Sequence, residues 1–263
     1  MAKIESYAPG SPCWAELATS DTESAKRFYT EMFGWTANDM PNPGGVYCIF
    51  QADGNDAAAL CTAQPGVPPH WGIYFSVADL DASAAKVAAS GGKIIAGPFD
   101  VMDFGRMAAA QDPQGAHFSL WQPKQHIGAT HGGPLNQVCW VELGTPDPAG
   151  AISFYQGLFG WKTKPETGVA EAQYIELSNG PAPMGGVLPM RGDEWKGIPP
   201  HWTMYISVAD CNERTAKAQQ MGAKVCVPPT DIPNVGRFSM LSDAQGAMFS
   251  LIQLTAMQQP ATA

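Results

Sequence analysis

A long segment that occurs twice constrains the fold of this chain more than any other feature. Residues 68–79 read Pro-Pro-His-Trp-Gly-Ile-Tyr-Phe-Ser-Val-Ala-Asp, and residues 199–210 read Pro-Pro-His-Trp-Thr-Met-Tyr-Ile-Ser-Val-Ala-Asp. Upstream, Trp-Ala-Glu-Leu at 14–17 returns as Trp-Val-Glu-Leu at 140–143. The longer segment returns after 131 residues and the shorter after 126, and matches this long at nearly the same separation indicate an internal duplication. The chain is therefore predicted to contain two similar domains.

The length of 263 residues agrees with two domains of about 120 residues each, which can bury a core without disulfides or a metal. We place the first domain at 11–123 and the second at 136–254. The segment 124–135 is rich in glycine and has no hydrophobic period, so we expect it to be the linker.

The formal net charge of −9 and the pI of about 4.9 argue against nucleic acid and anionic membranes as partners, since both repel an acidic surface. No run approaches the ~18 apolar residues of a membrane span. The first ten residues lack the apolar core of an export signal, and none of the six cysteines stands in a Cys-x-x-Cys pair. We expect a cytoplasmic protein with reduced thiols.

The hydrophobic pattern predicts two strand–helix–strand–strand units in each half. In the first unit, the residues before Gly34 have helical spacing, and Thr19-Ser20-Asp21 offers capping side chains. The second unit begins at His70, with a helix capped by Asp79 or Asp81. The strands expected in the first half are 12–18, 46–51, 57–63, 70–77, 93–99, 106–111 and 116–122. Two such units joined edge to edge form a cup lined by alternate strand residues.

Several motifs together resemble the vicinal oxygen chelate superfamily, which includes glyoxalases, bleomycin-resistance proteins and extradiol dioxygenases. The motifs are Phe28-Tyr29 with Phe33-Gly34-Trp35, Val77-Ala78-Asp79-Leu80-Asp81, Phe104-Gly105-Arg106 and Asp112-Pro113-Gln114-Gly115. The resemblance implies an α+β fold of two tandem domains. Each would be a pair of βαβββ units that form a curved mixed sheet around a cup.

The resemblance also implies where a divalent metal would be held in each cup, by His, Gln or Glu on three strands. In this chain those positions hold other residues: Trp14, Gly72 and Ser119 in the first domain, and Trp140, Thr203 and Ser250 in the second. Segments 57–63 and 184–190 contain no acid. We therefore expect no metal cofactor at the usual family positions.

A displaced metal site is the alternative in the first domain. Glu16, His70 and His117 stand two residues from the family positions and so share their strand faces. In the second domain Glu142 and His201 persist, but Met248 replaces His117. Histidines hydrogen-bonded at the strand entrance, and glutamates paired with a neighbouring His or Arg, are the structural alternative.

The catalytic candidates are Glu16 and Glu142 as general bases, with His70 and His201 as acids or ligands. The ligand-binding candidates form an aromatic cup with a few polar groups: Trp14, Tyr74, His117, Ser119, Trp140, Thr203, Tyr205 and Ser250. Alternatively, these aromatic residues fill the cups as core. We expect Arg106 and Arg237 to pair with carboxylates, Trp35 and Trp161 to pack in the core, and His126 and His131 to be solvated.

The predicted function is a glyoxalase-like protein with two aromatic cups that bind a small organic molecule. Lyase, isomerase or dioxygenase chemistry is implied if the chain is an enzyme. The alternatives are a sequestering, resistance-type protein without catalysis and a scaffold that binds a protein partner. We expect a monomer or a weak homodimer, because each half supplies the pairing surface for the other.

Overall fold

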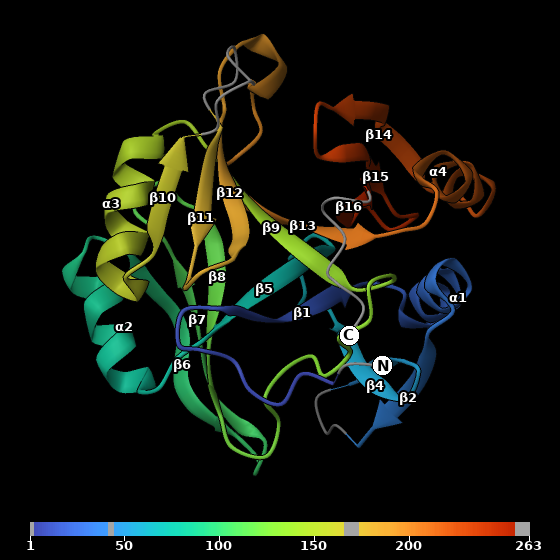
Figure 1. The fold of residues 1–263 in the computed structure, drawn as a ribbon. Coiled ribbons are helices and arrows are strands. Elements are labelled where there is room, and N and C mark those ends of the chain that lie inside the picture. Colours follow the sequence, from blue (N-terminus) through green and yellow to red (C-terminus); the bar gives the residue numbers. More distant parts are fainter. Residues whose placement is uncertain (1–2, 42–44, 166–173, 256–263) are drawn as a thin grey trace.

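Each half of the chain forms one mixed eight-stranded sheet (Figure 1). The structure is a computed structural model and describes residues 3–41, 45–165 and 174–255. The strand orders are β2-β3-β4-β1-β5-β8-β7-β6 and β10-β11-β12-β9-β13-β16-β15-β14. The two orders correspond strand for strand, as the sequence repeat predicts.

The elements of the first half are β1 (Pro12–Thr19), α1 (Thr22–Phe33), β2 (Thr36–Met40), β3 (Tyr47–Ala52), β4 (Asn55–Thr62), β5 (His70–Ser76), α2 (Leu80–Ala89), β6 (Lys93–Val101), β7 (Gly105–Gln111) and β8 (His117–Pro123). Those of the second half are β9 (Val138–Thr145), α3 (Pro148–Phe159), β10 (Lys162–Pro165), β11 (Ile175–Ser178), β12 (Pro183–Pro189), η1 (Asp193–Trp195), β13 (His201–Ser207), α4 (Cys211–Gln220), β14 (Lys224–Ile232), β15 (Gly236–Ser242) and β16 (Met248–Leu254). Each half is thus two βαβββ units. No helix in the described ranges is long and apolar enough to cross a membrane.

Strand β2 was missing from the strands expected on the pattern of the residues. Its sequence, Thr-Ala-Asn-Asp-Met, is exposed along nearly its whole length at the edge of the sheet. An edge strand without a buried face shows no alternation of apolar and polar residues, so the pattern gives no signal.

The helices begin and end where the capping residues predict. Asp21 accepts a hydrogen bond from the backbone N–H of Ser24 at 3.0 Å, and Gly34 ends α1 in the left-handed conformation at φ 68°. At α2 the cap is Asp79 rather than Asp81, with its carboxylate 2.9 Å from the Ala82 nitrogen.

The core lies between the two sheets and is shared by both halves. Phe75 of β5 contacts Trp202 of β13 at a ring separation of 5.2 Å. Helix α1 packs against the other half through Tyr29, whose ring lies 5.8 Å from Phe249. In Figure 1, α1 and α4 lie on one side of the molecule and α2 and α3 on the other. Each half therefore completes the core of its counterpart.

Two buried tyrosine–aspartate hydrogen bonds cross between the halves. The Tyr29 hydroxyl donates to Asp243 at 3.0 Å, and the Tyr155 hydroxyl donates to Asp112 at 3.1 Å. The other oxygen of Asp112 accepts three backbone N–H groups of its turn, and burial raises the pKa of this carboxyl. The Asp-x-Gln-Gly turns are therefore interdomain contacts as well as hairpin turns.

This shared core decides which residues can line a cup. In β1, Ala15 and Leu17 are buried in the core between the sheets, so Trp14 and Glu16 lie on the opposite face. Trp35 and Trp161 are 3% and 2% exposed, which confirms that both pack in the core. The cups are the faces of the two sheets that point away from the shared core.

Candidate functional site

Strand pairing brings the predicted cup residues of each half to one face of its sheet. In the first half, Trp14 lies opposite Tyr74, and Tyr74 lies beside Ser119, while Glu16 lies opposite Gly72. The antiparallel β1–β5 pair and the parallel β5–β8 pair set this register. The second half repeats it with Trp140, Glu142, Thr203, Tyr205 and Ser250.

A buried carboxyl stands at the base of the first cup. Tyr74 donates its hydroxyl to Glu16 at 2.9 Å, and the Cys61 thiol lies 3.7 Å from the same oxygen. Burial raises the pKa of Glu16, and the hydrogen bonds from Tyr74, Tyr47 and Cys61 oppose the shift. The hydrogen-bond donors are therefore phenols and a thiol, not the His or Arg expected from the sequence. His70 acts on Glu16 through a weaker coulombic interaction.

The second cup holds the same arrangement around Glu142. Tyr205 donates its hydroxyl to the carboxyl at 3.0 Å, Tyr174 supplies a second hydrogen bond, and the Trp140 indole N–H donates to the Tyr174 oxygen at 2.8 Å. Burial raises the pKa of Glu142 to about 6. Because burial holds the pKa of Tyr205 far higher, that phenol stays a donor while the carboxyl changes its charge.

Tyr47 and Tyr174 are the site residues that the sequence reasoning missed. Tyr47 begins β3, and Tyr174 directly precedes β11, so the two occupy equivalent places in the repeat. An alignment of the halves would have found them, because a tyrosine stands at the start of the same strand in both. The surrounding residues differ too much for a motif to be evident by eye.

The predicted histidines lie outside these hydrogen-bonded groups. The Nδ1 atoms of His70 and His201 are each 2.9 Å from a proline carbonyl, Pro68 and Pro199, as the structural alternative anticipated. His117 is exposed beside Gln111. None of these three histidines forms a hydrogen bond with Glu16 or Glu142, and their catalytic or binding roles remain a prediction.

The linker covers Trp14 in the first cup, while Glu16 and Ser119 of the same cup remain partly exposed. The imidazole of His126 meets the Trp14 ring edge-on at 4.7 Å, and its backbone oxygen accepts the Trp121 indole N–H at 2.8 Å. Tyr7 also bonds the linker, through the Ala129 carbonyl at 2.8 Å. His131 is 3% exposed. The expectation that the linker histidines are solvated was therefore wrong, because this segment covers apolar rings.

The second cup keeps unpartnered polar groups. The Thr203 hydroxyl is buried beside Glu142 without a hydrogen-bond partner. The Ser250 hydroxyl is also buried and lies beside Tyr205, whose pKa it lowers slightly, but the two do not meet hydrogen-bond geometry. Trp140 is only partly buried, whereas Trp14 is 7% exposed. Unpartnered buried hydroxyls are costly, which makes them candidates to bind a ligand.

A pocket of about 350 Å³ lies at one end of β9 in the second half. It is formed by the 190–200 loop, which includes η1 and is longer than the 63–69 loop of the first half. Trp195 of this loop lies 6.5 Å from the His201 ring, and Met190 lies against Gly144, two residues beyond Glu142. The longer loop thus enlarges the rim of the second cup.

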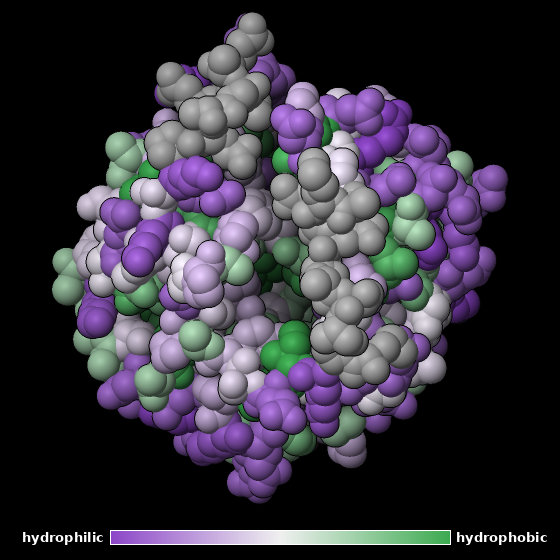
Figure 2. All heavy atoms as spheres, viewed as in Figure 1, coloured by the Kyte–Doolittle hydropathy of each residue, from purple (hydrophilic) through white to green (hydrophobic). Residues whose placement is uncertain are grey.

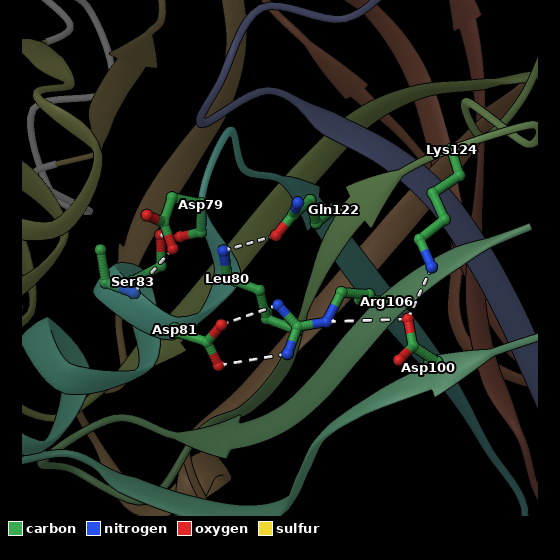
Figure 3. A network of polar contacts seen from close by, with 9 residues as sticks. Asp79, Leu80, Asp81, Ser83, Asp100, Arg106, Gln122 and Lys124 are labelled. Carbon is green, nitrogen blue, oxygen red and sulfur yellow. Dashed lines mark hydrogen bonds and ion pairs between the residues drawn. The ribbon is translucent and has the colours of Figure 1, made fainter.

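The hairpin arginines pair with carboxylates and do not enter the cups. Figure 3 shows Arg106 between Asp81 of α2, at 2.7 Å, and Asp100 of β6, which also binds Lys124. Arg237 pairs with Asp231 in the second half at 2.7 Å. These contacts confirm the carboxylate pairing expected from the sequence. Arg106 shares a strand face with the core residue Ala108, opposite to the cup.

The residues at the family's metal positions do not fit a divalent ion. Trp14 and Trp140 present indole N–H groups, which donate and cannot coordinate. Each cup has one carboxyl, already engaged by phenols, and the described residues contain no group of three or more His, Cys, Asp or Glu that could hold a metal. The displaced site at Glu16, His70 and His117 stays a prediction.

The comparisons with known proteins agree with this architecture. The model of the Glyoxalase/Bleomycin resistance protein/Dioxygenase superfamily matches residues 12–120 and 137–251. "Putative glyoxylase CFP32" of Mycobacterium tuberculosis is 40% identical over 261 residues, which cover 96% of this chain and 98% of the relative. "Anthracycline biosynthesis protein DnrV" of Streptomyces peucetius is 34% identical and covers 94% of both chains.

Solved structures share the fold at low identity. The Mn(II)-bound glyoxalase of Novosphingobium aromaticivorans has a TM-score of 0.66 at 16% identity, over 94% of this chain and 83% of the other. The 2,3-dioxygenase LapB of Pseudomonas sp. KL28 has a TM-score of 0.65 at 15% identity, over 97% and 96%. With a family match in each half, the chain belongs to the glyoxalase/bleomycin resistance protein/dioxygenase superfamily.

Proposed function

We propose that the second cup binds a small organic molecule and that Glu142 exchanges a proton with it. The observation that carries this proposal is a buried carboxyl, held by two phenols, whose pKa of about 6 lies near neutral pH. A general base works best when its pKa is close to the working pH. The partly buried indole of Trp140 and the free hydroxyl of Thr203 supply an apolar wall and a polar contact for the ligand.

The arrangement suits a reaction in which one proton moves. The Glu142 carboxylate accepts a proton from a carbon next to a carbonyl group, and the resulting acid returns it to a neighbouring atom of the same molecule. Tyr205 and Tyr174 stabilise the charged form by donating to it. Thr203 donates to the substrate oxygen on which charge develops. This chemistry is an isomerisation and consumes no oxidant.

The names of the relatives suggest which molecules to try. One relative is named a glyoxylase and another an anthracycline biosynthesis protein. A hemithioacetal and an anthracycline are therefore the first probes. The aromatic lining of the cup favours the polycyclic compound, because indole and phenol rings stack on flat ring systems.

The experiment measures binding and proton exchange separately. Quenching of tryptophan emission reports binding, and proton NMR in D₂O reports deuterium incorporation into the ligand. We expect Glu142→Gln to bind with similar affinity but to exchange at least about 100-fold more slowly. Glu16→Gln is the matched control and should exchange at the wild-type rate, because the proposal places proton exchange at Glu142 in the second cup.

A sequestering protein without catalysis is the second candidate, because the same carboxyl and phenols occur in the first cup, where Trp14 is buried under the linker. That repetition indicates that a glutamate between two tyrosines can be part of the fold. Under this alternative the probes bind, and deuterium incorporation is absent in the wild type as well as in Glu142→Gln. If Trp140→Ala and Thr203→Val both bind the probes as tightly as the wild type, both candidates are contradicted.

A further inference from the structure

A cavity of about 200 Å³ lies between the two halves, at the equivalent starts of β1 and β9. One wall is formed by Cys13, Trp14 and Ala15, and the opposite wall by Cys139, Trp140 and Val141. Figure 2, drawn in the view of Figure 1, shows a hollow near the centre of the surface, with hydrophobic atoms at its bottom. The cavity is thus built by the duplication itself, from one segment of sequence used twice.

The polar groups around this cavity are engaged elsewhere. The thiols of Cys13 and Cys139 each donate to the carbonyl of a cup tyrosine at 3.5 Å. The Tyr7 hydroxyl donates to Ala129, and the Trp140 N–H donates to Tyr174. No charged side chain is among the lining residues. Among the lining side chains, a ligand would therefore meet ring faces, methyl groups and sulfur, with the donors of Cys13, Cys139, Tyr7 and Trp140 already engaged.

Packed proteins leave few voids larger than a water molecule, so a space of this size between the halves is unusual. A cavity of roughly 150 Å³ lined by apolar side chains is large enough to bind benzene. The cavity between the halves is larger and has two indoles in its walls. We propose that it is a binding site for an uncharged aromatic molecule of one or two rings, separate from both cups.

The separation from the cups follows from the lining. Neither Glu16 nor Glu142 contacts the cavity, whereas Trp14 and Trp140 do. Each of these indoles interacts with a tyrosine of its own cup, Tyr47 or Tyr174. An aromatic molecule in the cavity would therefore contact the indoles and leave the carboxyls untouched.

Iodobenzene is the probe that tests this site, because its heavy atom quenches tryptophan emission and can be located by anomalous diffraction. Binding to the wild-type chain should saturate, and the iodine should lie between Trp14 and Trp140. Benzoate, of similar size but charged, should not bind there. Thr203→Val, which should weaken ligand binding in the second cup, should bind iodobenzene as tightly as the wild type, because Thr203 does not line the cavity. This variant therefore separates the cavity from the function proposed for the second cup.

Two variants fill the cavity, Ala129→Leu from the linker and Val138→Phe from the second half. Each should weaken iodobenzene binding at least tenfold while circular dichroism stays unchanged. Ala85→Leu, on the exposed face of α2, is the matched control and should bind normally. The proposal is overturned if both filling variants fold and bind iodobenzene with wild-type affinity. It is also overturned if benzoate binds as well as iodobenzene, or if the iodine is located in a cup.

Discussion

The two cups share a carboxyl and differ in what surrounds it. Glu16 and Glu142 are each held by two tyrosines at equivalent positions. In the first cup the linker covers Trp14, and the aromatic residues form a buried cluster with Cys13 and Ala59. In the second, Thr203 stands where the first has Gly72, and its hydroxyl has no partner.

This comparison separates what the fold requires from what a ligand would require. Burying an acid without a cation costs free energy in both halves, so its presence in both shows that two phenols suffice to accommodate it. The unpartnered hydroxyl and the partly buried indole occur in the second cup, where they give the fold no evident benefit. The second cup is therefore the better candidate for function.

The largest expected difference between the cups is the cost of removing their indoles. Trp14→Ala should destabilise the chain by about 3–5 kcal/mol, since Trp14 is buried against His126 and the linker. Trp140→Ala should cost roughly half as much, because that indole is only partly buried. Urea unfolding followed by circular dichroism measures both. Equal costs would show that the second cup is as tightly packed as the first.

The repeat predicted the two domains, the shared strand faces and an aromatic cup that contains Trp14 and Tyr74, because alternation within a strand and equivalence between halves are local properties of the sequence. The register that sets Trp14 opposite Tyr74 came from the structure. The closure of the first cup by His126 could not be predicted. A linker has no period, and its path depends on which surface it covers. The tyrosines that hold the carboxyls were missed because Tyr47 lies on a strand distant in sequence from β1.

The titration of Glu142 should give the next largest effect. Its pKa is about 6 in the folded chain, above the ordinary value of 4.5, so the folded state binds more protons between these values. Stability from this group is therefore complete below about pH 4.5, falls as the pH rises to about 6, and is constant above. The loss is about 2 kcal/mol by proton linkage.

Urea unfolding of Glu142→Gln and wild type across this pH range measures the difference. The glutamine variant should lack this loss, so its stability relative to wild type should rise by about 2 kcal/mol between pH 4.5 and 6. Other carboxyls with raised pKa values, such as Asp112, cancel in the comparison because both proteins contain them. Parallel pH profiles would mean that the second cup admits enough water to keep Glu142 near its ordinary pKa.

A smaller effect should come from the hydroxyl that distinguishes the second cup. Thr203→Val keeps the shape of the side chain and removes a buried polar atom without a partner, so it should stabilise the chain by about 1 kcal/mol. The same substitution should weaken ligand binding in the second cup. Thermal unfolding without ligand tests the first expectation, and a loss of stability would show that this hydroxyl is bonded within the fold.

The smallest predicted effect concerns the thiol that only the first cup places beside its carboxyl. Cys61 lies 3.7 Å from Glu16, and a hydroxyl there is a stronger donor than a thiol. Cys61→Ser should therefore lower the pKa of Glu16 towards its ordinary value, and Cys61→Ala should raise it further. Infrared titration of the carboxyl band, compared with Glu16→Gln to assign it, follows this shift. If neither variant moves the band, the two phenols alone determine the charge of Glu16, and the two carboxyls are chemically equivalent despite their different surroundings.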